Sequence, residues 1–139
     1  MEAIEIKRVS GEYGFEATDD QGNIARLDNS LNSGGNNFGV RPMQSLLIAM
    51  GACSGIDVIS ILKKQRQDLQ DYSMKIEGER EKAGDMSLWK KAHITFNLSG
   101  TIDPDKAFKA CQLSVEKYCS VAETLRRAGC TITWEVNVN

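Results

Sequence analysis

The sequence predicts a single α+β domain with mainly antiparallel sheet, extending over residues 1–139. Alternating apolar and polar residues predict strands in six segments, and apolar residues three or four apart predict three helices. The predicted order is three strands, a long helix, two strands, two helices and a last strand (β-β-β-α-β-β-α-α-β). No repeat, proline-rich linker or low-complexity tract divides the chain, and a length of 139 residues is that of one ordinary domain.

The first three strands are predicted over residues 3–9, 13–18 and 24–28, where apolar and polar residues alternate. Gly11 and the polar cluster around Gly22 are typical of the turns that join such strands, so these segments predict a meander. A loop rich in Asn and Gly follows over residues 29–39, and we expect it to be too polar to pack.

A long helix is predicted from Pro42, which fits the first helical position because the amide there has no intrahelical partner. The first half of this helix has hardly any polar face, so it should be buried all round, whereas residues 63–68 should be exposed. Gly51 and Gly55 lie one turn apart, and we expect them to allow close packing against a neighbouring element.

The second half of the chain holds two middle strands, over residues 72–80 and 91–98, then two helices and a strand. Asp103 and Pro104 predict the start of a helix that runs to about residue 118. Ser120 with Glu123 forms a capping-box sequence, which predicts a short third helix ending at Gly129. In the last strand the predicted inner face consists of Cys130, Ile132, Trp134, Val136 and Val138.

The composition is that of a soluble globular protein: 41% of the residues are hydrophobic and 26% are charged. Because 17 Lys and Arg stand against 19 Asp and Glu, there is no strong field for nucleic acid or an anionic membrane, and neither partner is expected. The amino terminus has no signal-peptide pattern, and the charge-free apolar run over residues 42–56 is too short to span a bilayer. We therefore expect a cytoplasmic protein.

The four cysteines are the residues that indicate chemistry. Without a CxxC pair, and with one histidine in the chain, a zinc site is not expected, and the cysteines are predicted to be thiols. Cys111 and Cys130 are in phase with buried faces and are expected to fill the core. Cys119 directly precedes a helix start, where the dipole favours a thiolate. Cys53 lies in a run of small residues, a pattern that fits core filling slightly better than an approachable thiol.

Three other features of the sequence bear on possible sites. His93 falls on the solvent side of its strand by alternation, so we do not expect it to be a base or a metal ligand. The glycine-rich segment 34–39 lacks the spacing of a phosphate loop. Arg80 is the last residue on one face of the predicted strand 72–80, where its guanidinium could either pair with a thiolate or reach solvent.

Two motifs carry a resemblance to a known family. The first runs from Arg41 into Gly51-Ala52-Cys53-Ser54-Gly55-Ile56-Asp57-Val58, and the second, far downstream, is Glu116-Lys117-Tyr118-Cys119-Ser120-Val121-Ala122. Together they resemble the OsmC/Ohr family (osmotically inducible protein C and organic hydroperoxide resistance protein), in the branch with Gly-x-Cys-Ser-x-Ile-Asp-Val. The resemblance covers almost the whole chain.

This resemblance implies an OsmC-like fold, an intertwined homodimer and a thiol-dependent peroxidase that reduces organic hydroperoxides in oxidative-stress defence. By position, Cys53 is then the peroxidatic thiol, which forms a sulfenic acid, and Cys119 is the resolving thiol, which forms the disulfide. The residues alone, without the resemblance, indicate that Cys119 is the more activated thiol. An external dithiol such as a lipoyl group is the implied reductant, with no bound cofactor or metal.

The chain departs from the family pattern beside the helix-opening proline. Related peroxidases place there a glutamate that orients an arginine against the reactive sulfur, whereas this chain has Met43 and Gln44. Gln44 can still accept a hydrogen bond, and the arginines that could activate Cys53 are, in order, Arg80, Arg41 and Arg26. Two alternatives stay open: a non-enzymatic thiol redox sensor, and a small-molecule binding protein that has kept the fold but lost catalysis.

Overall fold

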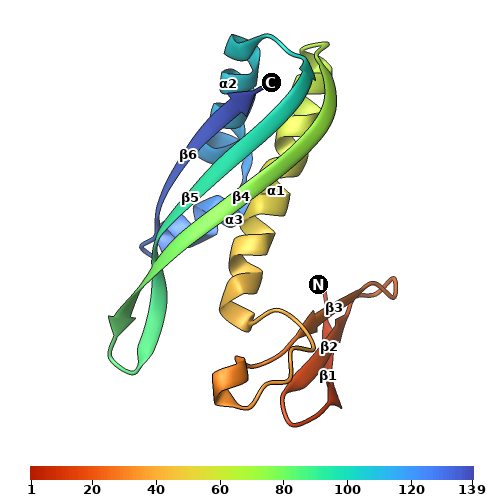
Figure 1. Ribbon diagram of the computed structural model, residues 1–139, viewed down its shortest axis with the longest axis vertical. Helices are drawn as coiled ribbons and strands as arrows, with labels where there is room; N and C mark the ends of the chain where they lie inside the picture. Colours follow the sequence, from red (N-terminus) through yellow and green to blue (C-terminus); the bar gives the residue numbers. More distant parts are fainter. The chain divides into compact units, whose positions relative to one another are not determined.

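The computed structural model describes all residues from Met1 to Asn139 (Figure 1). The chain forms two compact units, Met1–Leu46 and Leu47–Asn139, which are described in turn. Mixed α and β structure with mainly antiparallel pairing is confirmed.

The first unit contains the predicted meander. Strands β1 (Glu5–Ser10), β2 (Gly14–Thr18) and β3 (Ile24–Leu27) form an antiparallel sheet in the order β1-β2-β3. Gly11, in the turn between β1 and β2, has a φ of 58°, a conformation that glycine adopts at little cost.

None of residues 29–39 in the loop after β3 is buried, as expected for so polar a segment, but specific hydrogen bonds hold its backbone. It contains a 3₁₀ turn, η1 (Leu31–Ser33), and folds around the buried carboxylate of Asp28. This carboxylate accepts hydrogen bonds from the backbone N–H groups of Asn36 (3.0 Å), Phe38 (3.1 Å) and Asn29 (2.7 Å). These bonds lower the pKa of Asp28, with those from Asn36 and Phe38 contributing most. One acidic side chain thus satisfies several amides of a polar loop.

The second unit is built on a three-stranded sheet in the order β4-β5-β6. Strands β4 (Asp68–Ala83) and β5 (Met86–Thr101) form a long antiparallel hairpin, whereas β6 (Thr131–Val138) runs parallel to β5. The parallel pairing follows from the connection between them, because a helical crossover returns the chain in the same direction. This crossover consists of α2 (Pro104–Leu113), the π-helical turn η2 (Ser114–Tyr118) and α3 (Ser120–Arg127).

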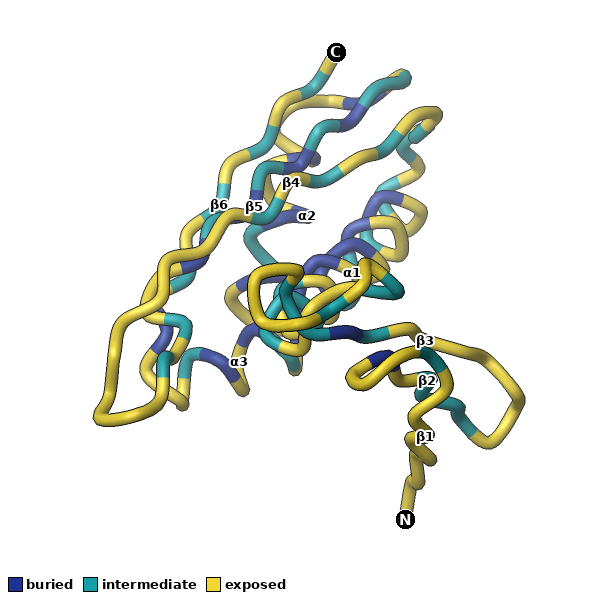
Figure 2. Tube along the Cα trace, turned by 60° about the horizontal axis from the view of Figure 1, so that its bottom comes forward, coloured by how far each residue is buried: buried dark blue, intermediate teal, exposed yellow.

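The long helix α1 (Pro42–Lys64) and helices α2 and α3 lie on one face of this sheet, and the other face is open (Figure 1). The central strand β5 supplies the predicted buried face, Ala92, Ile94, Phe96 and Leu98. Figure 2 shows this burial recurring along β5, while the tip of the β4–β5 hairpin is exposed. The expected close packing at the helix glycines is confirmed: a Cβ at Gly51 would lie 2.6 Å from Ile76 Cδ1, and one at Gly55 would lie 2.7 Å from Met74 Cε.

Helix α1 is not buried all round, so that prediction is wrong for the single chain. The sheet covers one side of the helix, and the opposite side exposes Ile48 (53%), Ile56 (64%) and Ile59 (39%). Because the helix continues past the run 42–56, it is long and apolar enough to cross a membrane by length and composition. Its covered side packs on the sheet in the manner of a core helix. The residues buried on that side are Met50, Gly51, Ser54, Gly55, Val58 and Leu62.

Candidate functional site

The two cysteines of the sequence motifs come together where α1 meets the start of α3. Cys53 lies on α1 and is partly exposed, whereas Cys119 directly precedes α3 and is only 3% exposed. The two side chains are near enough for Cys53 to contribute to the raised pKa of Cys119, and neither cysteine is in a disulfide. The fold therefore places a solvent-accessible thiol next to a buried one.

The position of Cys119 is set by the irregular end of the preceding helix. Helix α2 widens into the π-helical turn η2, which closes with a hydrogen bond from the Cys119 N–H to the Ser114 carbonyl (2.7 Å). Such π-helical turns are rare and recur at functional sites. At Cys119 the backbone becomes extended (φ −74°, ψ 104°), and the chain turns into α3.

Cys119 itself caps α3, which corrects the predicted cap at Ser120 by one residue. The sulfur accepts a hydrogen bond from the Ala122 N–H at 3.4 Å. The reason is that Ser120 already has helical geometry, so the last non-helical residue is the cysteine. By contrast, the predicted cap of α2 is confirmed, since the Asp103 side chain accepts from the Asp105 N–H at 2.8 Å.

A second donor reaches the same sulfur from α1. The fully buried Ser54 hydroxyl donates to Cys119 Sγ at 3.2 Å, and Cys119 Sγ lies 3.9 Å from the Met50 carbonyl. Burial raises the pKa of the Cys119 thiol, while the hydrogen bonds from Ser54 and Ala122 oppose this rise, and the neighbouring Cys53 adds to it. At neutral pH Cys119 is therefore a thiol beside two groups that favour its ionised form.

A second buried serine supports this arrangement. Ser114, in η2, donates to the Ser54 carbonyl at 2.9 Å and lies 3.4 Å from Asp57 Oδ2. Neither Ser54 nor Ser114 is among the site residues predicted from the sequence. The sequence does contain a feature that identifies Ser54: it is the polar member of the otherwise apolar series Met50, Ser54 and Val58 on one side of the helix. A buried hydroxyl needs a hydrogen-bond partner, so this position predicts a polar contact.

The residues predicted to activate Cys53 have other contacts. The Arg80 guanidinium donates to the Ser87 carbonyl (3.0 and 3.3 Å) and lies over the Trp89 ring, within the β4–β5 hairpin. In the first unit, the Gln44 side chain accepts from the Arg41 N–H (3.0 Å). The activating roles of Arg80, Arg41 and Gln44 thus stay predictions.

The third arginine, Arg26, is also in the first unit. It pairs with Glu16 at 3.4 Å and lies over the Phe38 ring, 5.3 Å from its centroid. Its role likewise stays a prediction.

Cys111 and Cys130 are buried, as their phase predicted. Burial raises the pKa of Cys111 to about 12 from its ordinary value of 9.0. Between these values the unfolded chain loses this proton and the folded chain keeps it, so stability falls as pH rises.

We expect Cys111→Ala to weaken this alkaline loss of stability, by at most about 1.4 kcal/mol per pH unit. Urea denaturation at pH 8 and pH 10.5, with excess reductant, measures the difference between variant and wild type. Ser114→Ala, at another fully buried but non-ionisable side chain, is the matched control and should leave the pH dependence unchanged. Equal pH slopes for Cys111→Ala and wild type would contradict the expectation.

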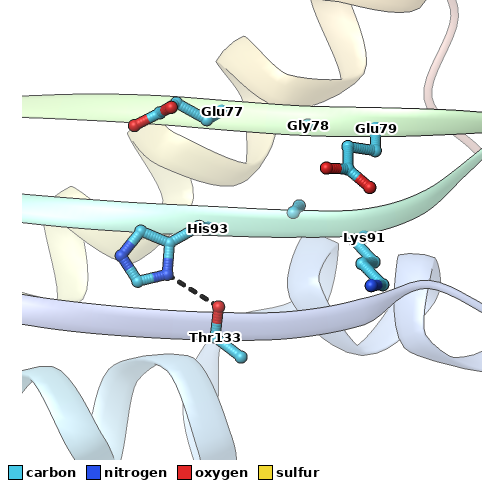
Figure 3. A pocket seen from close by; sticks show the side chains of 7 residues that line it. Glu77, Gly78, Glu79, Lys91, His93 and Thr133 are labelled. Carbon is cyan, nitrogen blue, oxygen red and sulfur yellow. Dashed lines mark hydrogen bonds between the residues drawn. The ribbon is translucent and has the colours of Figure 1, made fainter.

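The open face of the sheet carries a depression of about 450 Å³, lined by Glu77, Glu79, Lys91, His93 and Thr133 among others (Figure 3). His93 Nδ1 lies 2.7 Å from Thr133 Oγ1, and its Nε2 lies 3.2 Å from Glu135 Oε1. His93 therefore faces away from α1 and its cysteine, in agreement with the predicted alternation. Metal-binding geometry is not found in any group of three or more His, Cys, Asp or Glu side chains.

Comparison with known proteins shows the family of the chain. The OsmC-like protein family matches residues 34–135. Protein YhfA of Escherichia coli (strain K12) is 43% identical over 88 residues, which cover 63% of this chain. The match spans 65% of the length of that relative.

Solved structures match over nearly the full length. A hypothetical protein from Aquifex aeolicus is 28% identical with a TM-score of 0.80, and the match covers 100% of this chain and 98% of that one. An organic hydroperoxide resistance protein OsmC from Legionella pneumophila shares the fold at 16% identity and a TM-score of 0.72, over 99% of this chain and 96% of that one. With the family match over most of its residues, the chain belongs to the OsmC-like protein family.

Proposed function

We propose that this protein is a thiol-dependent peroxidase that reduces organic hydroperoxides with its two adjacent cysteines, in defence against oxidative stress in the cytoplasm. The observation that supports the proposal most is the pairing of the partly exposed Cys53 with the buried Cys119. A hydroperoxide can reach the first thiol, while the second is held beside it out of solvent. Membership of a family that includes proteins named for organic hydroperoxide resistance adds to this support.

In the proposed cycle the Cys53 thiolate attacks the O–O bond of the hydroperoxide. An S–O bond forms and the O–O bond breaks, so Cys53 becomes a sulfenic acid, and the departing alkoxide takes up a proton, equivalent to the one the Cys53 thiol lost, and leaves as an alcohol. The Cys119 sulfur then attacks Cys53, forming the S–S bond and breaking the S–O bond, and the oxygen leaves as water. An external dithiol of the lipoyl type reduces the disulfide by thiol–disulfide exchange and is itself oxidised to a disulfide. No bound metal or cofactor takes part in these steps.

We further propose that the active form is a homodimer. The exposed side of α1 supports this, since Ile48, Ile56 and Ile59 are accessible there, on the helix that also carries Cys53. Large exposed apolar side chains on one side of a helix are typical of an interaction site. The same side of α1 in a second copy of the chain is a self-complementary partner.

Catalytic turnover tests the proposed activity. We expect the reduced wild-type protein to consume many equivalents of tert-butyl or cumene hydroperoxide with dihydrolipoamide or dithiothreitol, and to act more slowly on hydrogen peroxide. Oxidation of one equivalent without further turnover would instead identify a redox sensor. Failure to oxidise at all, with a small molecule co-purifying, would identify a binding protein.

A further inference from the structure

We propose that the Ser54 hydroxyl is a further catalytic residue, one that stabilises the Cys119 thiolate as it forms and so speeds disulfide formation with Cys53. The proposal rests on the proposed two-cysteine function and assigns Ser54 to the second, resolving step of that cycle.

The first support is the setting of Ser54. It lies on the covered side of α1 between Met50 and Val58, and all three side chains are fully buried. A hydroxyl in such a place must find a partner inside the protein. The partner is Cys119 Sγ at 3.2 Å, an atom that reacts in the proposed cycle.

The direction of this hydrogen bond gives it a function. Ser54 donates and the sulfur accepts, and a thiolate is a stronger acceptor than a thiol. The Ala122 N–H at the start of α3 donates to the same sulfur at 3.4 Å. Both groups thus favour the ionised form of a sulfur that burial otherwise keeps protonated.

The Ser54 backbone is held in place independently. Its carbonyl accepts the hydrogen bond from the Ser114 hydroxyl at 2.9 Å, which ties α1 to η2. Ser114 is equally buried but does not donate to the sulfur. The two serines therefore form a matched pair for substitution. The Ser54 hydroxyl contacts the reacting sulfur, whereas the Ser114 hydroxyl contacts the Ser54 backbone.

The chemistry separates the resolving step from the peroxide step. In the resolving step Cys119 must lose its proton, its sulfur bonds to Cys53 sulfur, and the oxygen of the sulfenic acid leaves with that proton as water. In the peroxide step Cys53 attacks the substrate, and Cys119 stays a thiol. A donor on Cys119 should consequently affect disulfide formation much more than peroxide consumption.

A single-turnover experiment tests the proposal. Reduced wild type, Ser54→Ala and Ser114→Ala are mixed with one equivalent of tert-butyl hydroperoxide. Peroxide loss and the Cys53–Cys119 disulfide are then followed separately, the disulfide by mass spectrometry of quenched samples. For Ser54→Ala we expect disulfide formation to slow about tenfold and its pH profile to move to higher pH, with peroxide loss within about twofold of wild type. Ser114→Ala should keep the wild-type pH profile, and Ser54→Thr, which retains the hydroxyl, should restore much of the rate.

The outcomes are distinguishable. Unchanged disulfide formation and pH profile in a folded Ser54→Ala would overturn the role of Ser54 while leaving the peroxidase intact. If the wild type consumes no peroxide, the proposed function fails. In that case diamide, which oxidises dithiols without peroxide, measures whether Ser54→Ala slows formation of the same disulfide. Equal rates with diamide would also count against Ser54.

Discussion

Cys53→Ser is expected to abolish catalysed hydroperoxide turnover, so that only the slow direct reaction of the dithiol with the hydroperoxide remains. The reason is that the hydroxyl of serine is not ionised at neutral pH and cannot replace the thiolate. Cys119→Ser should behave differently. Its first equivalent of peroxide should be consumed at a rate near that of wild type, since Cys53 remains. The sulfenic acid then has no resolving thiol and should proceed to sulfinic acid in excess peroxide. Steady-state assays with dihydrolipoamide, combined with mass spectrometry of Cys53, measure both effects.

Cys130→Ser is the matched control for these variants. Cys130 is also buried, but its sulfur lies near the Thr131 carbonyl and outside the cysteine pair. Turnover of this variant should equal that of wild type. Equal peroxide consumption by wild type, Cys53→Ser and Cys119→Ser would refute the two-cysteine mechanism.

Ile56→Glu is expected to convert the proposed dimer into a monomer. Ile56 is 64% exposed in the single chain, so the substitution should leave the fold of each copy intact. In a dimer built on α1, the same position becomes buried, and a carboxylate without a partner is costly in an apolar interface. We expect the dissociation constant to rise by at least about 100-fold, which sedimentation velocity over a range of concentrations measures.

Ile56→Leu keeps the apolar surface and should remain a dimer, so it serves as the control for Ile56→Glu. Circular dichroism of both variants checks that the secondary structure is retained. A wild-type protein that sediments as a monomer at all concentrations would contradict the proposed dimer directly. If Ile56→Glu instead stays dimeric, α1 is not the interface.

The element order and the two cysteine positions could be predicted because both depend on local pattern. Periodicity identifies the residues that share a face of α1 or β5, and the motif spacing places the cysteines on particular elements. Periodicity does not tell what covers a face, which is why the sequence predicts burial of α1 on every side although Ile48 and Ile56 are exposed.

Other features depended on contacts between residues distant in sequence. The backbone arrangement of the loop after β3 depends on one carboxylate, Asp28, which accepts hydrogen bonds from amides eight and ten residues away. The link from Ser54 to Cys119 joins residues 65 positions apart. The start of α3 was misplaced by one residue because it is fixed by the backbone dihedrals of Cys119, which the side-chain types of the capping box do not determine.

The hydrogen bond from the Ala122 N–H to the Cys119 sulfur makes this amide a reporter of the oxidation state of the protein. When Cys119 forms a disulfide, the acceptor of this hydrogen bond changes from a thiol sulfur to a disulfide sulfur, without any change in sequence or ligand. The chemical shift and the solvent-exchange rate of that single amide proton should therefore alternate between two values as the thiol pair is oxidised and reduced. Nuclear magnetic resonance could follow the redox state of the protein at this position, with no added dye or label.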